Sequence, residues 1–276
     1  MEWLMSVLYG LVSGLTEFFP VSSGAHQAML LRIFGQETAP GLLKLMTHLG
    51  CLIGLLVCCR SEFSRLRRAR KQARSGSARR RQSADVQSVL TLKMLRTAML
   101  PLIVGFLFSA SAAGLSRRLN LIAVFLVLNG ILLFVPQLFA RGNKDARSVS
   151  RLDGMLLGLG SGLSVIPGFS RVGAVVSLAA LRGAGNQFAL HFALLLSVPA
   201  LVITMGLDLL GMITGGFGAL GVQMVIRCLL SGCMAFLGSW CSILTMRFLS
   251  VKAGFSGFAY YCWGAALFSF ILFMMI

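Results

Sequence analysis

Long apolar segments alternate with short basic runs along this chain, and few folds can accommodate that pattern. Of its 276 residues, 57% are hydrophobic and only 12% are charged, whereas a soluble domain carries roughly 25% charged residues. A single soluble core cannot bury so many apolar side chains, so most of them must face lipid. The sequence therefore predicts an all-α polytopic membrane protein with one membrane domain over residues 1–276.

The net charge of +17 comes from 25 Lys and Arg residues against 8 Asp and Glu residues. Nucleic-acid binding is one interpretation of such a charge. The placement opposes it, because most basic residues lie in short runs between apolar segments. Cytoplasmic loops of membrane proteins have this composition, and they are attracted to anionic lipid head groups. We therefore expect anionic membrane lipids, and no nucleic acid, as partners.

Six segments are long and apolar enough to cross a bilayer, which takes about 20 residues of helix. They cover residues 41–59, 97–114, 119–137, 187–205, 218–238 and 256–275. Two further apolar stretches, 3–31 and 152–183, are interrupted near their centres by Gly, Pro and hydroxyl residues. The sequence thus predicts about six transmembrane helices and two apolar segments of a different kind.

The basic residues predict an orientation in the membrane. A cytoplasmic location for the basic loop 60–96, and for the runs at 141–151 and 247–252, gives both termini an extracytoplasmic position. Under that topology each interrupted segment must enter the membrane and return on the same side. The first enters from outside and the second from the cytoplasm. The chain then divides into two repeats of opposite orientation, 1–140 and 152–276.

An internal sequence match supports this inverted-topology repeat. Residues 10–16 read Gly-Leu-Val-Ser-Gly-Leu-Thr and residues 158–164 read Gly-Leu-Gly-Ser-Gly-Leu-Ser, and each block then reaches a proline, Pro20 or Pro167. The Gly-xxx-Gly spacing in both blocks allows close helix contact. Irregular backbone within a membrane is tolerated only where protein buries it or water lines it. We therefore expect two re-entrant helical hairpins that meet tip to tip near the midplane and hold a polar ligand.

Polar and ionisable residues gather at both predicted tips. The first tip reads Thr16-Glu17-Phe18-Phe19-Pro20-Val21-Ser22-Ser23-Gly24-Ala25-His26, and the second reads Pro167-Gly168-Phe169-Ser170-Arg171-Val172-Gly173. Ionisable groups inside a membrane are costly and indicate function, although Glu17 and Arg171 could also form a structural ion pair. Arginine suits a bidentate grip on phosphate, and a serine with a histidine in reach is the minimum for an activated nucleophile. The tips together predict a site for an anionic head group.

The two tip sequences resemble the signatures of the undecaprenyl-diphosphate phosphatase (bacitracin-resistance) family. His48-Leu49-Gly50 and Leu195-Leu196-Ser197-Val198-Pro199 also fit that family, so the resemblance covers nearly the whole chain. It implies the inverted-repeat fold deduced above, in the bacterial plasma (inner) membrane, with a site that opens to the extracytoplasmic side. The implied reaction removes the terminal phosphate from a polyprenyl diphosphate and so returns the lipid carrier for cell-wall (peptidoglycan) synthesis.

The resemblance also implies roles for individual residues. Ser23 would be the nucleophile and His26 its proton-transfer partner. Glu17 would hold a divalent cation, magnesium or calcium, or act as a base, and Arg171 would clamp the diphosphate. The other substrate-binding residues would be Ser13, Ser22, Gly168 and Ser170.

This chain departs from the family pattern at three positions. Ser13 stands where the family usually has a second carboxylate, four residues before Glu17. That spacing would place both carboxylates on one helix face, as a shared cation requires. Val172 and Val175 stand where the family has hydroxyl residues after Arg171. We therefore expect weaker binding of cation and phosphate.

Two alternatives to the phosphatase remain open. The missing polar groups also fit a non-hydrolytic transporter or flippase of a polyprenyl phosphate on the same scaffold. A non-catalytic interaction protein would leave the intramembrane Glu17, His26 and Arg171 unexplained. Outside the tips, His48 is expected either to line the cavity or to pack, and Asp208 is expected in a loop outside the membrane. The sequence leaves a homodimer open.

Overall fold

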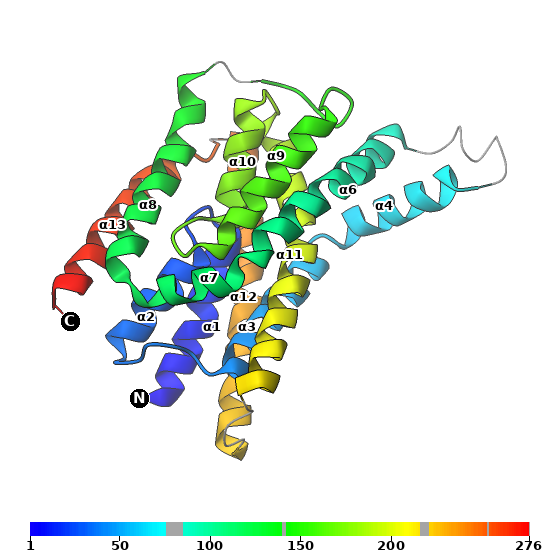
Figure 1. The fold of residues 1–276 in the computed structure, drawn as a ribbon. Coiled ribbons are helices and arrows are strands. Elements are labelled where there is room, and N and C mark those ends of the chain that lie inside the picture. The colour runs from blue at the N-terminus through cyan, green and yellow to red at the C-terminus, as the bar shows by residue number, and fades with distance from the viewer. Residues whose placement is uncertain (76–84, 140–141, 216–220, 253, 276) are drawn as a thin grey trace.

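The structure is a computed structural model, and it describes residues 1–75, 85–139, 142–215, 221–252 and 254–275. These ranges form twelve α-helices and three short 3-10 helices, so the predicted all-α fold is confirmed (Figure 1). The α-helices are α1 (Glu2–Phe18), α2 (Ser23–Ile33), α3 (Gly41–Cys58), α4 (Arg60–Ala73), α6 (Val86–Leu107), α7 (Ser109–Ala113), α8 (Leu119–Phe134), α9 (Arg151–Gly162), α10 (Arg171–Leu181), α11 (Asn186–Gly215), α12 (Val222–Lys252) and α13 (Gly257–Met275).

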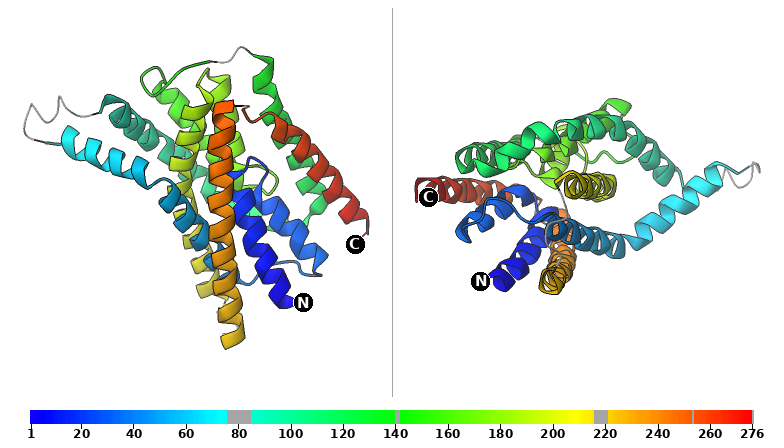
Figure 2. Two further views of the ribbon diagram at one scale, coloured as in Figure 1. Left: turned by 180° about the vertical axis from the view of Figure 1, so that it is seen from behind. Right: turned by 60° about the horizontal axis from the view of Figure 1, so that its bottom comes forward.

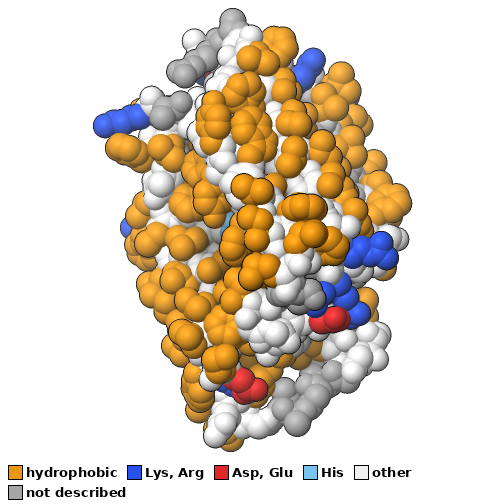
Figure 3. Space-filling view, turned by 90° about the vertical axis from the view of Figure 1, so that its left-hand side faces the viewer, with side chains coloured by type: hydrophobic (Ala, Val, Ile, Leu, Met, Phe, Trp, Pro, Cys, Tyr) orange, Lys and Arg blue, Asp and Glu red, His pale blue; other side chains and the backbone are white. Residues whose placement is uncertain are grey.

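Six helical segments of the described residues are long and apolar enough to cross a membrane. They are α3, α6, α8 with the 3-10 turn that follows it, α11, α12 and α13. Figure 3 shows a face of the molecule that is mostly covered by apolar side chains, with few charges. The chain is therefore a multi-pass membrane protein.

Three of the predicted spans have nearly the observed bounds, but the one expected at 97–114 was misplaced. Helix α6 begins at Val86 because Asp85 caps it, accepting hydrogen bonds from the Gln87 N–H (3.2 Å) and the Ser88 hydroxyl (2.5 Å). The basic segment 60–96 is consequently not a simple loop. Helix α4 and the start of α6 occupy most of it, and residues 76–84 lie outside the described part.

Helices α11 and α12 both extend beyond the spans expected at 187–205 and 218–238. Serines lowered the apolar signal of α12, but several of them, Ser231, Ser242 and Ser250, have hydrogen-bond partners inside the protein. The Ser242 hydroxyl, for example, lies within hydrogen-bond distance of the carbonyls of Ser239 (3.0 Å) and Gly14 (3.2 Å). Hydroxyls that bond to helix carbonyls are compatible with a buried helix, and α12 continues through these serines to Lys252. The basic run expected at 247–252 is therefore the last part of this helix.

Each interrupted segment folds into a helical hairpin, α1–α2 or α9–α10. Both turns contain a proline, Pro20 or Pro167, which has no N–H to continue a helix. The Ser22 hydroxyl caps α2 by accepting from the Ala25 N–H, and the Ser170 hydroxyl caps α10 by accepting from the Gly173 N–H. The two hairpins come from opposite ends of the bundle, and their tips approach each other in its middle (Figure 1).

Each hairpin packs against a long helix from the other half of the chain. Helix α1 lies against α12, and α9 lies against α6 (Figures 1 and 2). A Cβ added at Gly14 would lie only 2.2 Å from the Ala235 carbonyl oxygen, and one at Gly158 only 2.2 Å from that of Ala98. The close helix contact predicted from the Gly-xxx-Gly spacing is therefore present in both halves.

Candidate functional site

The tips of the two hairpins are in direct contact. The Ser22 hydroxyl accepts a hydrogen bond from the Gly168 N–H (2.9 Å), and the Ser170 hydroxyl donates to the Phe19 carbonyl (3.2 Å). Gly168 has φ +114°, and a Cβ there would lie 2.3 Å from the Cβ of Phe125, so a glycine is required. The predicted tip-to-tip contact is confirmed. Ser22, Gly168 and Ser170, which we expected to bind substrate, join the tips.

Asn129 of α8 connects both tips. Its side-chain oxygen accepts from the Ser170 N–H (2.9 Å), and its amide nitrogen donates to the Pro20 carbonyl (3.0 Å). Asn129 is completely buried. Sequence analysis missed this residue, although an asparagine in an otherwise apolar span is a signal, because a buried amide needs hydrogen-bond partners.

Glu17 and Arg171 form an ion pair at the joined tips. Glu17 Oε1 lies 2.7 Å from Arg171 Nη1, and the side chains are 7% and 10% exposed, respectively. Glu17 is near the end of α1, and Arg171 is the first residue of α10. The two ionisable residues singled out from the sequence are thus together. The structural ion pair between Glu17 and Arg171 is therefore present, and it holds an arginine between the two hairpin tips.

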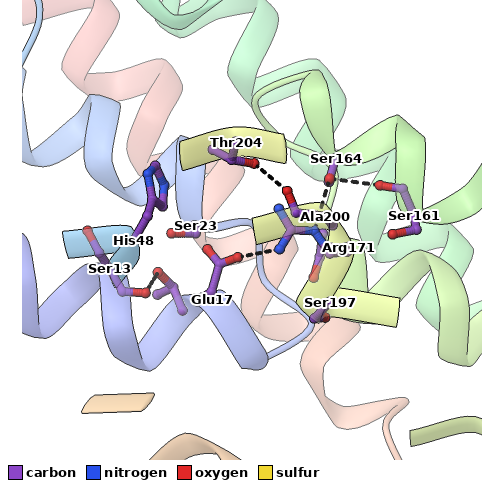
Figure 4. Close-up of polar contacts among 12 residues, drawn as sticks. Ser13, Glu17, Ser23, His48, Ser161, Ser164, Arg171, Ser197, Ala200 and Thr204 are labelled. Atoms are coloured by element: carbon purple, nitrogen blue, oxygen red, sulfur yellow. Dashed lines mark hydrogen bonds and ion pairs between the residues drawn. The ribbon is translucent and has the colours of Figure 1, made fainter. Parts of the chain in front are cut away.

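Hydroxyl groups surround the ion pair (Figure 4). Ser164, in the turn after α9, accepts a hydrogen bond from Arg171 Nε (3.4 Å). Ser197 and Thr204 of α11 donate back to carbonyls of their own helix. The buried Ser161 hydroxyl of α9 has no hydrogen-bond partner among the residues that the structure describes.

Ser13 and Ser23 are connected through an amide that sequence analysis overlooked. The side-chain nitrogen of Gln27 donates to the hydroxyls of Ser13 (3.0 Å) and Ser23 (3.1 Å). The Tyr9 hydroxyl donates to the side-chain oxygen of Gln27 (3.2 Å). In Figure 4, Ser13 and Ser23 both lie on the α1–α2 side of the site, beside Glu17. Both serines are therefore at the site, as expected.

His26 lies on α2, but its ring nitrogens are used elsewhere. Nδ1 is 2.8 Å from the Ser22 carbonyl oxygen, and Nε2 is 2.9 Å from the hydroxyl of Tyr261 on α13. Within the described ranges no hydrogen bond joins His26 to Ser23, Glu17 or Arg171. His26 instead lines a groove of about 480 Å³ between α1, α2 and α13, whose other walls are apolar. The expected contact between the histidine and the nucleophile is not formed here.

His48 pairs with a carboxylate that we expected in an external loop. Its Nδ1 lies 2.6 Å from Asp208 Oδ2, and both side chains are mostly buried. Asp208 belongs to α11, which continues to Gly215, so the loop assignment was wrong. Figure 4 shows His48 on the same side of the site as Ser13. The pair links α3 to α11 next to the hairpin tips.

The protein groups at this site do not by themselves fit a resident divalent cation. Magnesium and calcium take six or more oxygen ligands, several of them carboxylates. Glu17 is the only carboxylate that the described residues bring to the ion pair, and Arg171 already neutralises it. No cluster of three or more His, Cys, Asp or Glu residues occurs in the described part of the chain. Ser13 supplies a hydroxyl where a second carboxylate would be needed.

A larger polar cavity, of about 760 Å³, lies apart from the ion pair. Glu62, Arg65, Asp85, Lys144 and His191 are among its lining residues, whereas Glu17 and Arg171 are not. The Ser88 hydroxyl, which donates to the Asp85 carboxylate, lowers the pKa of that carboxyl below its ordinary value. We call this cavity the vestibule. Its lining comes from α4, α6, α8, α10, α11 and α12, together with residues next to these helices.

The fold and the site together define a class: a polytopic helical membrane protein in which two hairpins from opposite ends hold a carboxylate–arginine pair between them. Comparison with known proteins then gives the family. The family described as Bacitracin resistance protein BacA matches residues 6–268. The chain belongs to this family.

Several curated relatives match over most of their length. The protein named undecaprenyl-diphosphatase from Desulforudis audaxviator is 33% identical over 236 residues, which is 85% of each chain. That from Methanobrevibacter smithii is 29% identical over 272 residues, or 95% of each chain. That from Carboxydothermus hydrogenoformans is 26% identical over 263 residues, or 95% of this chain and 94% of the relative.

Proposed function

We propose that the protein hydrolyses a polyprenyl diphosphate, with undecaprenyl diphosphate as the leading candidate, to the monophosphate and free phosphate. The observation that carries the proposal is the Glu17–Arg171 pair at the joined tips, with Ser23 beside it. An arginine in a mostly buried site suits a bidentate grip on phosphate and offsets charge on a transferred phosphoryl group. The name undecaprenyl-diphosphatase, which the relatives carry, supports the same substrate class.

In the proposed mechanism, the terminal phosphate of the substrate displaces Glu17 from Arg171. The released carboxylate takes the proton of the Ser23 hydroxyl. Ser23 Oγ then forms a bond to the terminal phosphorus while the bond from that phosphorus to the bridging oxygen breaks, and polyprenyl monophosphate leaves. Glu17 passes this proton to the departing monophosphate. Water next attacks the phosphoserine and gives one proton to Glu17, and Ser23 Oγ takes that proton back as phosphate is released. Arg171 offsets charge on the phosphoryl group in both steps.

His26 and a divalent cation also belong to the proposal. The proton-transfer role of His26 rests on the sequence resemblance, because its observed partners are Ser22 and Tyr261. A divalent cation, magnesium or calcium, would need ligands beyond Glu17. The diphosphate itself supplies such oxygens, so we propose that any cation binds together with the substrate. When bound, it would neutralise phosphate charge.

The arrangement in the membrane is also part of this proposal. Both termini lie at one end of the bundle, and the segment between α8 and α9 lies at the other (Figure 1). Such an arrangement supports two inverted repeats, 1–140 and 152–276, with re-entrant hairpins that meet near the midplane. The basic residues of α4 would then face the cytoplasm and anionic lipids. The site would open to the extracytoplasmic side of a bacterial plasma membrane.

One observation favours the alternative of a polyprenyl phosphate transporter. The vestibule is a large polar cavity that does not reach the ion pair, and Glu17 and Arg171 are mostly buried. A transporter that exposes a central site to each side in turn has such a closed state. This alternative predicts lipid phosphate binding without release of phosphate.

The deciding experiment measures phosphate release from a long-chain polyprenyl diphosphate by the purified protein, with and without magnesium or calcium. We expect release by the wild type and none above background by Arg171→Ala. The matched control is Arg147→Ala, because Arg147 is exposed and distant from the tips in sequence. Binding without release by the wild type would favour the transporter. Equal release by Arg171→Ala and wild type would refute the site.

A further inference from the structure

Gln27, next to Ser23, has hydrogen-bond partners on both its amide nitrogen and its oxygen. Its amide nitrogen donates to two hydroxyls, those of Ser13 (3.0 Å) and Ser23 (3.1 Å). Its oxygen accepts from the Tyr9 hydroxyl (3.2 Å). A primary amide has two N–H donors, so both are committed. Tyr9 is buried at 1% exposure, and so is Ser13, which leaves the amide little freedom to turn.

This network determines which way the Ser23 hydroxyl can point. Because Ser23 Oγ accepts a hydrogen bond from Gln27, its own O–H proton must be directed away from the amide. A serine nucleophile needs this arrangement: one lone pair is held in place, one is free to attack, and the proton is available to a base. His26 cannot orient Ser23 in the observed state, because both of its ring nitrogens have other partners.

We propose that Gln27 is a positioning residue for Ser23, held in place by Tyr9 and Ser13. This inference rests on the proposed function, in which Ser23 is the nucleophile. It adds a residue that replaces histidine as the orienting neighbour. Ser13 then has a structural role in the network. Its hydroxyl, on α1, accepts a hydrogen bond from the side-chain amide of Gln27, which lies on α2 together with Ser23. The network therefore also fixes the geometry of the first hairpin around the nucleophile.

The test compares Gln27→Leu, Tyr9→Phe and the double variant with the wild type and with Gln187→Leu as a control. Gln187 is an exposed glutamine at the start of α11. We expect Gln27→Leu to lower kcat about tenfold, because a misplaced reacting group loses rate at this scale or more. KM should remain within about twofold. Tyr9→Phe should lower kcat by about threefold, and the double variant should match Gln27→Leu, because both changes act through one amide.

A second readout does not depend on phosphatase activity. A fluorophosphonate reacts with an activated serine by forming a bond from Oγ to phosphorus, with loss of fluoride and transfer of the hydroxyl proton to a base. Mass spectrometry of the peptide that carries Ser23 gives the labelling rate. We expect labelling of Gln27→Leu to be about tenfold slower than labelling of wild type and Gln187→Leu.

The outcomes separate the two ideas. Suppose that labelling of Ser23 depends on Gln27 but the wild type releases no phosphate. That result would refute the phosphatase and support the positioning role. Phosphate release and labelling that are unchanged in Gln27→Leu would overturn the positioning role alone. Additive losses in the double variant would also overturn it. If Gln27→Leu does not fold, Tyr9→Phe decides by the same criteria, with unchanged kcat and labelling as the contrary result. An absence of Ser23 labelling in the wild type would remove the basis of the inference.

Discussion

Glu17 Oε1 lies 2.7 Å from Arg171 Nη1, although 154 positions separate the two residues in the chain. The two charges come from different hairpins, and both are mostly buried. Burying an ion pair requires the desolvation of both partners, so the pair itself stabilises the fold little. Leaving one partner alone is far more unfavourable. In the proposed function, the pair keeps Arg171 in place for the phosphate that displaces Glu17.

This view of the ion pair predicts strong coupling between two substitutions. Glu17→Ala and Arg171→Ala should each lower the free energy of unfolding by about 3–5 kcal/mol, because each leaves a buried charge without its partner. The double variant should be less destabilised than the sum of the two. Thermal unfolding of the purified proteins in detergent measures this. Additive losses would mean that the two side chains are already hydrated in the folded protein.

His26 can be tested through its partner Tyr261. The Tyr261 hydroxyl occupies Nε2 of His26 at 2.9 Å, so proton transfer through that nitrogen requires the bond to break. Tyr261→Phe removes the bond and should preserve or raise kcat. His26→Ala should lower kcat by about 100-fold, as expected for loss of a general acid or base. Equal losses of kcat in the two variants would instead assign His26 to packing against α13.

The cation requirement can be changed at Ser13. Ser13→Glu would place a second carboxylate one helical turn before Glu17, on the same face of α1. More carboxylate ligands raise affinity for a divalent cation. The magnesium or calcium concentration for half-maximal phosphate release should therefore fall, by about tenfold. Ser13→Gln has the same size without the charge and is the control. The same shift in both variants would argue against a metal role for this position.

The close contacts of Gly14 and Gly158 predict that a larger side chain at either position lowers the free energy of unfolding to a similar extent. Gly14→Val and Gly158→Val would each push a side chain into the backbone of a packed helix, because an added Cβ already lies 2.2 Å from a carbonyl oxygen. Each should lower the free energy of unfolding by about 1–3 kcal/mol, the usual cost of overpacking. Gly206→Val is the control, since a Cβ at Gly206 meets no atom within 4 Å. The loss should appear in thermal melts of both variants and be absent from the control.

The sequence allowed the broad architecture of the site to be predicted because its signals are local. Prolines interrupt both hairpins, glycines repeat at helical spacing, and Glu17 and Arg171 are conspicuous in apolar surroundings. Tip contact followed from the requirement that buried backbone be satisfied. These features depend on single segments and on a rule about the membrane, so they did not require knowledge of tertiary packing.

What escaped prediction depends on contacts between distant segments. Asn129 joins both tips and His48 pairs with Asp208, yet in each case the partners lie in other segments of the chain. The start of α6 was missed because Lys93 and Arg96 lower its apolar signal, while the cap at Asp85 sets where the helix begins. The polar network of Gln27 was missed for the same reason as Asn129. Apolar periodicity carries no information about which helix a polar side chain faces.

The packing of each hairpin on the opposite half has a consequence for biogenesis. Helix α1 is synthesised well before the helix that covers its glycine face, α12. The hydrogen bond from Ser242 to the Gly14 carbonyl spans 228 positions. The contacts of α1 with α12 can therefore form only after α12 has been synthesised and inserted. The order of translation thus places the packing of α1 on α12 after the synthesis of both hairpin tips, and with them of Glu17 and Arg171.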